Sequence, residues 1–255
     1  MASNVGVEDS ESTEVAFGEL AMVHLRVGDA DRAMKFFGAL FQWDAERVVF
    51  PGHVSHYTIN TTTTIRILDD ASSPPVVPNY AVADVARVMA AIGESGGQIT
   101  EAEPAPDGGG WARGFDDQGL PLLVYRPRGY HAHEAPARAA SAELGVVFIR
   151  ADATRAAAFY GSVLGWSLTP AHPGSHYFDA MPGVGIFDEA AAMGGNVEPS
   201  ATVYFGVDAL RPALRRVESL GGTAGEPAPD MGPYFTALCT DDQGTTFGIM
   251  SAALE

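Results

Sequence analysis

Residues 24–43 read HLRVGDADRAMKFFGALFQW, and residues 148–166 read FIRADATRAAAFYGSVLGW. An offset of 123 (29 to 152) places Asp29 on Asp152, and an aromatic pair, a glycine and a tryptophan then match in the same order. The pentapeptide EPAPD recurs at this offset, and the tetrapeptide DDQG recurs with two more residues between its copies. Agreement in order along the whole chain indicates two copies of one domain.

The duplication divides the 255 residues into two units of common domain size. We predict an acidic leader over 1–15, a first domain over 16–127, a linker over 128–141 and a second domain over 142–255. The leader lacks the positive flank and apolar centre of a secretory signal, so we expect it to be disordered. Internal duplication replaces the partner that a single domain would need, which favours a monomer built as an internal pseudo-dimer.

A finer pattern recurs inside each copy. The alternating apolar stretch 20–27 is typical of a half-buried strand, and Asp29 can cap the helix that follows it. Strand-like segments come next, and the pattern then restarts with a second helix over 85–92, whose counterpart is 210–220. The DDQG turn leads into a closing strand, so each copy holds two β-α-β-β-β units.

The chain is strongly acidic, with 32 acidic against 15 basic residues and a net charge of −17. A field of that sign repels phosphate backbones and anionic lipid, so nucleic-acid and membrane partners are excluded. The single cysteine, Cys239, excludes an internal disulfide and fits a reducing compartment. No apolar run reaches the length of a membrane span. We therefore predict a cytoplasmic protein whose partner is a small-molecule ligand.

Three pairs of segments carry a resemblance to a known family. They are FFGALFQW (36–43) with AFYGSVLGW (158–166), NYAVADVARVMAAIGESGG (79–97) with VYFGVDALRPALRRVESLGG (203–222), and FDDQGLPLLVY (115–125) with TDDQGTTFGIM (240–250). The chain resembles the vicinal-oxygen-chelate superfamily, which includes glyoxalase I, extradiol dioxygenases, and bleomycin and fosfomycin resistance proteins. The resemblance implies an α+β fold in which four β-α-β-β-β modules form two glyoxalase-like domains, each curling an open-barrel sheet around a cavity.

Metal-using members of that superfamily supply His, Gln or Glu from the first strand of each module and Glu from the closing strand. The corresponding positions here are Met22, Val77, Leu123, Gly145, Thr202 and Gly248. A divalent ion needs about three nitrogen, oxygen or thiolate ligands, and only the weak hydroxyl of Thr202 qualifies. The sequence therefore predicts no metal and no other cofactor, which argues against glyoxalase I and dioxygenase chemistry.

Strand alternation predicts what lines the cavities instead, because residues two apart share a face. The first cavity gains an imidazole, an amide and a phenol. The second lies beside two glycines, which predicts a roomier and more apolar slot. His56-Tyr57 and His176-Tyr177 occupy matching places, so one residue of each pair should face inward. The predicted ligand-binding residues are Met22, His24, His56, Tyr57, Asn79, Trp111, Tyr125, Val147, His176, Tyr177, Tyr204 and Met250.

These features favour metal-independent binding of a small hydrophobic or aromatic metabolite, as in resistance or sequestration proteins. One alternative is a metal-free lyase, isomerase or cyclase, in which His24 is the general base and Tyr125 or Tyr57 donates a hydrogen bond to an oxyanion. Another alternative is that His24 has a purely structural role, in which its imidazole is hydrogen-bonded within the fold. A second alternative is a metal-dependent glyoxalase or dioxygenase with a noncanonical site, such as His24 with His56.

Overall fold

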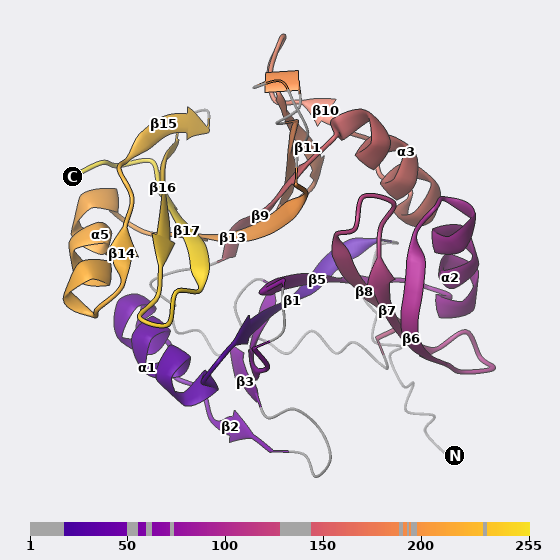
Figure 1. The fold of residues 1–255 in the computed structure, drawn as a ribbon, viewed down its shortest axis with the longest axis horizontal. Helices are drawn as coiled ribbons and strands as arrows, with labels where there is room; N and C mark the ends of the chain where they lie inside the picture. The colour runs from indigo at the N-terminus through magenta and orange to yellow at the C-terminus, as the bar shows by residue number, and fades with distance from the viewer. Residues whose placement is uncertain are drawn as a thin grey trace, which may run out of the picture.

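The computed structural model contains two strongly curved sheets, one from each half of the chain (Figure 1). The predicted leader and linker lie outside the described residues. Those described are 18–49, 56–59, 63–71, 74–127, 144–188, 191–192, 194, 198–231 and 234–255. Within them, no helix is both long and apolar enough to cross a membrane.

The first sheet has the strand order β2-β3-β4-β1-β5-β8-β7-β6. Its elements are β1 (Glu19–Val27), α1 (Ala30–Phe41), β2 (Arg47–Val48), β3 (His56–Ile59), β4 (Thr64–Asp69), β5 (Val76–Ala81), α2 (Val85–Glu94), β6 (Gln98–Pro104), β7 (Gly110–Phe115) and β8 (Pro121–Tyr125). Strand β1 runs parallel to β4 and antiparallel to β5. Two β-α-β-β-β modules therefore join where β1 meets β5.

The second sheet repeats this order as β10-β11-β12-β9-β13-β17-β16-β14, with β15 paired to β16. Its elements are β9 (Leu144–Ala151), α3 (Ala153–Leu164), β10 (Thr169–Pro170), β11 (Tyr177–Met181), β12 (Val184–Asp188), β13 (Ser200–Gly206), α5 (Leu210–Ser219), β14 (Thr223–Ala224), β15 (Ala228–Met231), β16 (Tyr234–Thr240) and β17 (Thr246–Ser251). The predicted α+β class and the four modules are confirmed.

Aspartate caps begin three of the helices, as the sequence predicts for Asp29. Its side chain accepts a hydrogen bond from the Arg32 backbone N at 2.9 Å, and Asp152 caps α3 in the same way at 3.0 Å. Such a cap satisfies one of the free N–H groups of the first turn. Helix α3 ends at Gly165, whose φ of +72° is the left-handed conformation that glycine adopts without strain.

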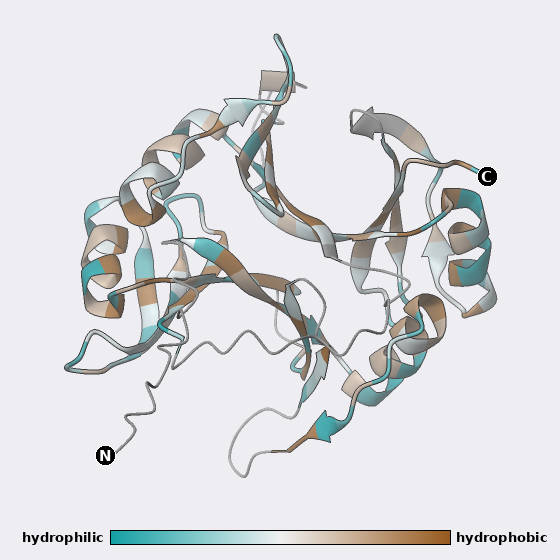
Figure 2. Ribbon diagram, turned by 180° about the vertical axis from the view of Figure 1, so that it is seen from behind, coloured by the Kyte–Doolittle hydropathy of each residue, from teal (hydrophilic) through white to brown (hydrophobic). Residues whose placement is uncertain are grey.

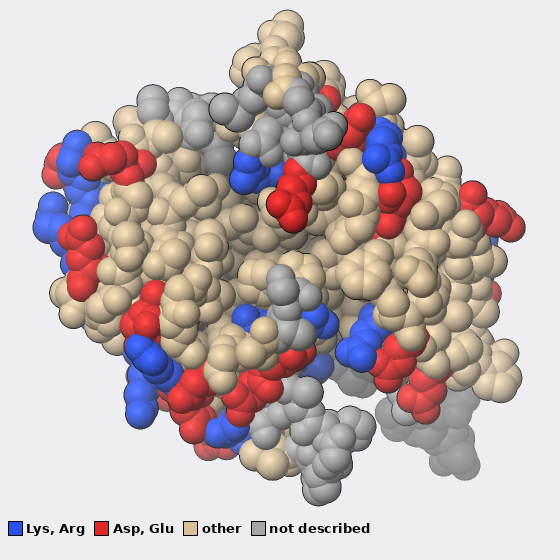
Figure 3. Space-filling view, in the orientation of Figure 1, with Lys and Arg blue, Asp and Glu red and all other residues tan. Residues whose placement is uncertain are grey.

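The two sheets lie back to back, and their concave faces open on opposite sides of the molecule (Figure 1). The helices fill the two flanks, where α1 lies beside α5 and α2 beside α3. Apolar residues from both halves form a single buried cluster between the sheets. In the hydropathy view, apolar residues recur along the helices and central strands (Figure 2). On the face that Figure 3 shows, charged side chains surround a centre of mostly uncharged atoms.

Aromatic side chains from the first helix of each half, or from the residues that follow it, pack on the sheet of the other half. The ring of Phe37 on α1 lies 5.2 Å from that of Phe247 on β17. On the opposite flank, the ring of Trp166 lies 5.2 Å from that of Tyr80 on β5. The duplicated aromatic positions therefore build the interface between the two halves, and burying them excludes water from it.

The DDQG turns also cross between the halves. The side-chain amide of Gln118 donates to the backbone O of Asp152 at 3.2 Å, and its Oε1 accepts from the Asp152 N at 2.9 Å. In the other copy, Gln243 Nε2 donates to the backbone O of Asp29 at 3.0 Å. Each turn thus holds the residue that caps the first helix of the other half.

Candidate ligand-binding cavity

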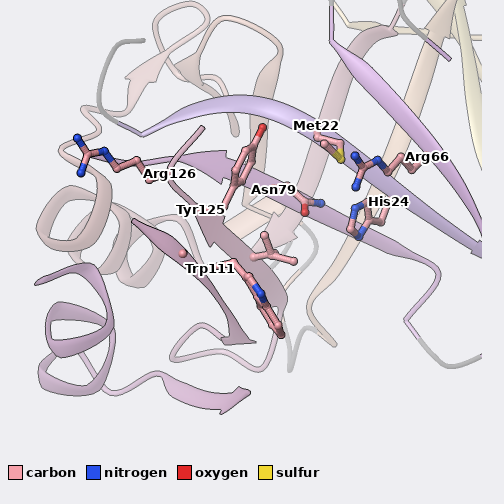
Figure 4. Close-up of a pocket in the computed structure, with 9 residues that line it drawn as sticks. Met22, His24, Arg66, Asn79, Trp111, Tyr125 and Arg126 are labelled. Carbon is pink, nitrogen blue, oxygen red and sulfur yellow. The ribbon is translucent and has the colours of Figure 1, made fainter. Parts of the chain in front are cut away.

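The concave face of the first sheet holds two adjoining cavities, of about 420 and 860 Å³. Both are lined by His24, Arg66, Trp111 and Leu123, so they form one site, which we call the first cavity. Figure 4 shows the smaller part of it. Strands of both modules contribute to this lining, so the site depends on the intact eight-stranded sheet.

Strand register brings these side chains together. His24 on β1 lies opposite Arg66 on β4, and Met22 on β1 lies opposite Asn79 on β5. Asn79 in turn lies opposite Leu123 on β8. The intervening residues point to the helices, because successive side chains of a strand alternate between its faces. Of the predicted first-copy residues, Met22, His24, His56, Asn79, Trp111 and Tyr125 line the cavity.

His24 places an unpartnered nitrogen in this lining. Its Nε2 is buried and has no hydrogen-bond partner among the residues that the structure describes. Burial, followed by the positive charges of Arg66 and Arg26, lowers the pKa of His24 to about 3. The imidazole is therefore neutral at physiological pH and carries one N–H group.

Arg66 places a half-buried guanidinium beside His24 (Figure 4). Its Nε is buried and has no hydrogen-bond partner in the described part of the chain. Burial lowers the pKa of Arg66, and no carboxylate is among the groups that shift it. Arg66 is not among the predicted site residues, although its position between Ile65 and Ile67, both fully buried on the other face, indicates it.

Two other polar groups of the lining have partners. The Asn79 side chain is 1% exposed, and its Nδ2 donates to the backbone O of Val77 at 2.7 Å. The indole Nε1 of Trp111 donates to Glu103 Oε2 at 3.3 Å. These bonds fix the amide and the indole ring, so Trp111 offers a planar apolar surface to a ligand.

Tyr57 does not face the cavity, contrary to the prediction. Its hydroxyl donates to Asp31 Oδ1 of α1 at 2.7 Å, on the helix side of the sheet. Strand alternation allows only one residue of the His56-Tyr57 pair to face inward. That residue is His56, which is 8% exposed and lines the larger part of the cavity.

The concave face of the second sheet holds a cavity of about 500 Å³, which we call the second cavity. The predicted residues Tyr177 and Tyr204 line it, together with Phe148 and Arg150. It is smaller than the 860 Å³ part of the first cavity, so the prediction of a roomier slot is wrong.

Neighbouring side chains fill the space beside the two glycines that were expected to open the second cavity. A Cβ at Gly248 would overlap the ring of Tyr204, and one at Gly145 would meet the Sδ of Met250. The space that these glycines leave is therefore occupied within the fold. Met250 is not part of the lining of the second cavity, contrary to its prediction as a ligand contact.

Val147 and His176 are also placed wrongly by the sequence repeat. Gly28 has no counterpart before Asp152, so the strand equivalences shift by one residue: Phe148 pairs with Thr202 as His24 pairs with Val77.

Val147 accordingly lies fully buried on the helix side. A similar shift occurs in β11. Tyr177 lies opposite Phe187 in the second sheet, as His56 lies opposite Leu68 in the first, so Tyr177 is the structural counterpart of His56. His176 is exposed and is not part of the second cavity's lining.

Comparison with known proteins agrees with this architecture. Residues 145–249 match the family model Glyoxalase/Bleomycin resistance protein/Dioxygenase superfamily. This match lies in the second half of the chain, and it is to the group of proteins that the sequence resembles. The resemblance in the sequence is thereby confirmed. No curated protein sequence matches the chain.

Solved structures share the fold of this protein at low sequence identity. The Mn(II)-bound glyoxalase from Novosphingobium aromaticivorans is 15% identical with a TM-score of 0.59, and the match covers 94% of this chain and 83% of that one. The 2,3-dioxygenase LapB from Pseudomonas sp. KL28 is 13% identical with a TM-score of 0.65, with 93% of both chains covered. At such identities the likeness establishes the fold alone.

The donor set of the first cavity does not fit a divalent metal. Among the described residues, no group of three or more His, Cys, Asp or Glu side chains could hold an ion. The inward positions at Met22 and Leu123 offer a thioether and a hydrocarbon, which are poor ligands for such ions. A noncanonical pair of His24 and His56 would have the guanidinium of Arg66 beside it, and that charge opposes a cation.

Proposed function

We propose that the protein binds a small aromatic or hydrophobic metabolite in the first cavity without a metal ion, in a role of sequestration or resistance. The observation that carries this proposal is the lining itself. The apolar side chains of Met22, Trp111 and Leu123 surround a few converging polar groups. Binding sites for small organic molecules have this composition, in which apolar walls supply affinity and polar groups fix orientation.

We infer that the binding protein works as a cytoplasmic monomer. Its two halves share one buried cluster, so each half supplies the packing surface that the other needs. Cys239 is buried and unpaired, which fits a reducing compartment. Sedimentation equilibrium of the purified chain tests the monomer, and a stable dimer would contradict it.

Calorimetric titration with a panel of aromatic natural products tests the proposed binding. We expect at least one compound to bind more tightly than millimolar. Trp111→Ala should lower the affinity for that compound about tenfold, the usual effect of removing a large aromatic contact. Phe148→Ala, in the second cavity, is the matched control and should leave the affinity unchanged. A broad panel without binding tighter than millimolar overturns the proposal.

The second candidate is a metal-free lyase, isomerase or cyclase, with His24 as base and Tyr125 as hydrogen-bond donor. The unpartnered Nε2 of His24, in the same cavity as Tyr125, favours it. The pKa of about 3 argues against it, because a base so weak has little driving force to take a proton.

Turnover separates binding from catalysis. His24→Ala that binds the ligand but no longer converts it would establish the enzyme. Unchanged binding with no conversion by either protein would leave sequestration.

A further inference from the structure

We propose that the ligand of the first cavity carries a carboxylate, or an anion of similar size, that pairs with the guanidinium of Arg66. This inference rests on the proposed binding function and names the chemical class of its ligand. It begins from a charge that the fold leaves without a counter-ion in the described residues. Burying a charged group without a partner is costly, so such a group indicates a partner supplied from outside.

The other arginines of the first cavity have partners. Arg26 Nε lies 3.4 Å from Asp70 Oδ2, and Arg113 pairs with Glu101. Arg126 donates to the backbone O of Asp107 and points away from the other labelled side chains (Figure 4). The Nε atoms of Arg26 and Arg66 are both buried without a hydrogen-bond partner in the described part of the chain. Arg66 differs from Arg26 because no carboxylate is among the groups that shift its pKa, whereas Arg26 has Asp70.

His24 adds a second unsatisfied group at the same place. It lies opposite Arg66 in the register of β1 and β4, and its Nε2 is buried without a described partner. A neutral imidazole can donate one hydrogen bond, and a guanidinium donates two in a planar fork. Together the two side chains present donors to one planar acceptor, which is the geometry that a carboxylate matches.

The charge of the cavity contrasts with that of the chain. Its charged lining residues are Arg26, Arg66, Arg113, Arg126, Asp70 and Glu103. Four bases against two acids give this cavity a positive excess in a protein whose net charge is −17. The surrounding acidic surface repels large polyanions, whereas a small anion can enter and reach the basic lining.

The lining next to Arg66 restricts the rest of the ligand. Met22 lies on the adjacent strand β1 and Leu123 on β8, and Trp111 presents its ring below Met22 (Figure 4). Such walls favour an apolar or aromatic body attached to the anionic group. The expected class is therefore a small aromatic or hydrophobic carboxylate.

The second cavity has no arginine at the position equivalent to Arg66, although Arg150 is part of its lining. Arg66 lies opposite His24 in the first sheet, and the equivalent pair in the second sheet is Gly185 and Phe148. The space beside Gly185 is taken by the Phe148 ring. The duplicated fold thus supplies an internal comparison, in which one copy has an arginine at this position and the other has a glycine covered by an aromatic ring.

Two probes of equal shape test the proposal, namely 2-naphthoate and the neutral 2-naphthamide, titrated by calorimetry at pH 7. We expect the native protein to bind the carboxylate at least about tenfold more tightly than the amide, as one charge-assisted pair suggests. Arg66→Gln should abolish that preference and change the affinity for the amide little. Arg150→Gln, which removes an arginine of the second cavity, is the matched control and should retain it.

Arg66→Lys keeps the charge without the planar fork, so we expect it to retain part of the preference. This variant keeps the test informative if Arg66→Gln does not fold. Equal affinities of the two probes for the native protein overturn the anion proposal and leave the proposed function standing. A preference that survives in folded Arg66→Gln also overturns it. If neither the probes nor the wider panel binds, both proposals fail.

Discussion

Arg155 donates a hydrogen bond from its Nε to Oδ2 of Asp117 at 2.9 Å, and this ion pair joins the first helix of the second half to the DDQG turn of the first. Arg32 and Asp242 repeat the pair on the other flank. Both arginines are about half exposed, so each pair by itself adds little to stability. The repeated DDQG motif therefore serves the contact between the halves, and this contact occurs twice.

The buried aspartate of each DDQG turn has different hydrogen-bond partners in the two copies. Asp116 Oδ2 accepts from the Tyr160 hydroxyl at 3.0 Å. Asp241, its counterpart, has Phe37 in place of the tyrosine, and its Oδ2 is buried without a partner among the described residues. At this aspartate, the two flanks of the pseudo-symmetric fold thus differ by one hydroxyl group.

Our first prediction concerns the effect of this hydroxyl group on the free energy of unfolding. Tyr160→Phe should lower the free energy of unfolding by about 1–3 kcal/mol, because it leaves the buried Asp116 oxygen unsatisfied. Phe37→Tyr should raise it by roughly 0.5–1.5 kcal/mol by giving Asp241 the missing donor. Urea denaturation of both variants measures the changes. Destabilisation by Phe37→Tyr would show that the hydroxyl does not reach Asp241.

The sequence predicted the class of fold, the duplication and the helices because these depend on patterns that repeat within the chain. Of the pair His24 and Arg66 in the first cavity, the sequence predicted only His24, from strand alternation. Arg66 was accessible to the same argument, since Ile65 and Ile67 place it on the opposite face. A charged residue between two isoleucines in a predicted strand is the signal that identifies it.

The second cavity could not be predicted as well, for two physical reasons. A single extra residue, Gly28, shifts the strand by one position, and a shift of one reverses the face of every side chain. Glycine in the sequence also does not indicate whether the space beside it is empty. Here the ring of Tyr204 fills the space at Gly248, which only the three-dimensional packing reveals.

The packing of Tyr204 on Gly248 leads to the second prediction. Gly248→Leu, which introduces the residue of the first copy, should cost about 1–3 kcal/mol because the new side chain overlaps the ring. Adding Tyr204→Asn, also a first-copy residue, removes the ring and should recover part of that loss. Thermal unfolding of the two single variants and the double variant completes the cycle, and strictly additive effects would contradict the contact.

The orientation of β3 gives the third prediction. Tyr57→Phe should change the affinity for 2-naphthoate by less than about twofold, since its hydroxyl bonds Asp31 on the helix side. His56→Ala should lower the affinity for the same probe about fivefold, because His56 lines the cavity. Calorimetry on these two neighbouring positions decides which one faces the ligand. The reverse order of effects would restore Tyr57 as a ligand contact.

The fourth prediction concerns pH. The pKa of His24 is about 3 in the folded protein against 6.5 for an unperturbed histidine. Between these values the unfolded chain binds a proton that the folded chain does not, so the contribution of His24 makes stability fall as the pH drops from 6.5 towards 3. The slope should approach about 1.4 kcal/mol per pH unit in that window.

His24→Gln should remove this slope, because glutamine does not titrate. The difference between the native and variant curves, measured by urea denaturation from pH 7 to pH 3.5, isolates His24. Asp116 and Asp241, whose buried carboxyls have a raised pKa, contribute equally to both curves and cancel. His172→Gln, which removes an exposed histidine, is the control variant. Parallel curves for the native protein and His24→Gln would mean that His24 can accept a proton in the folded state, which would reopen its role as a base.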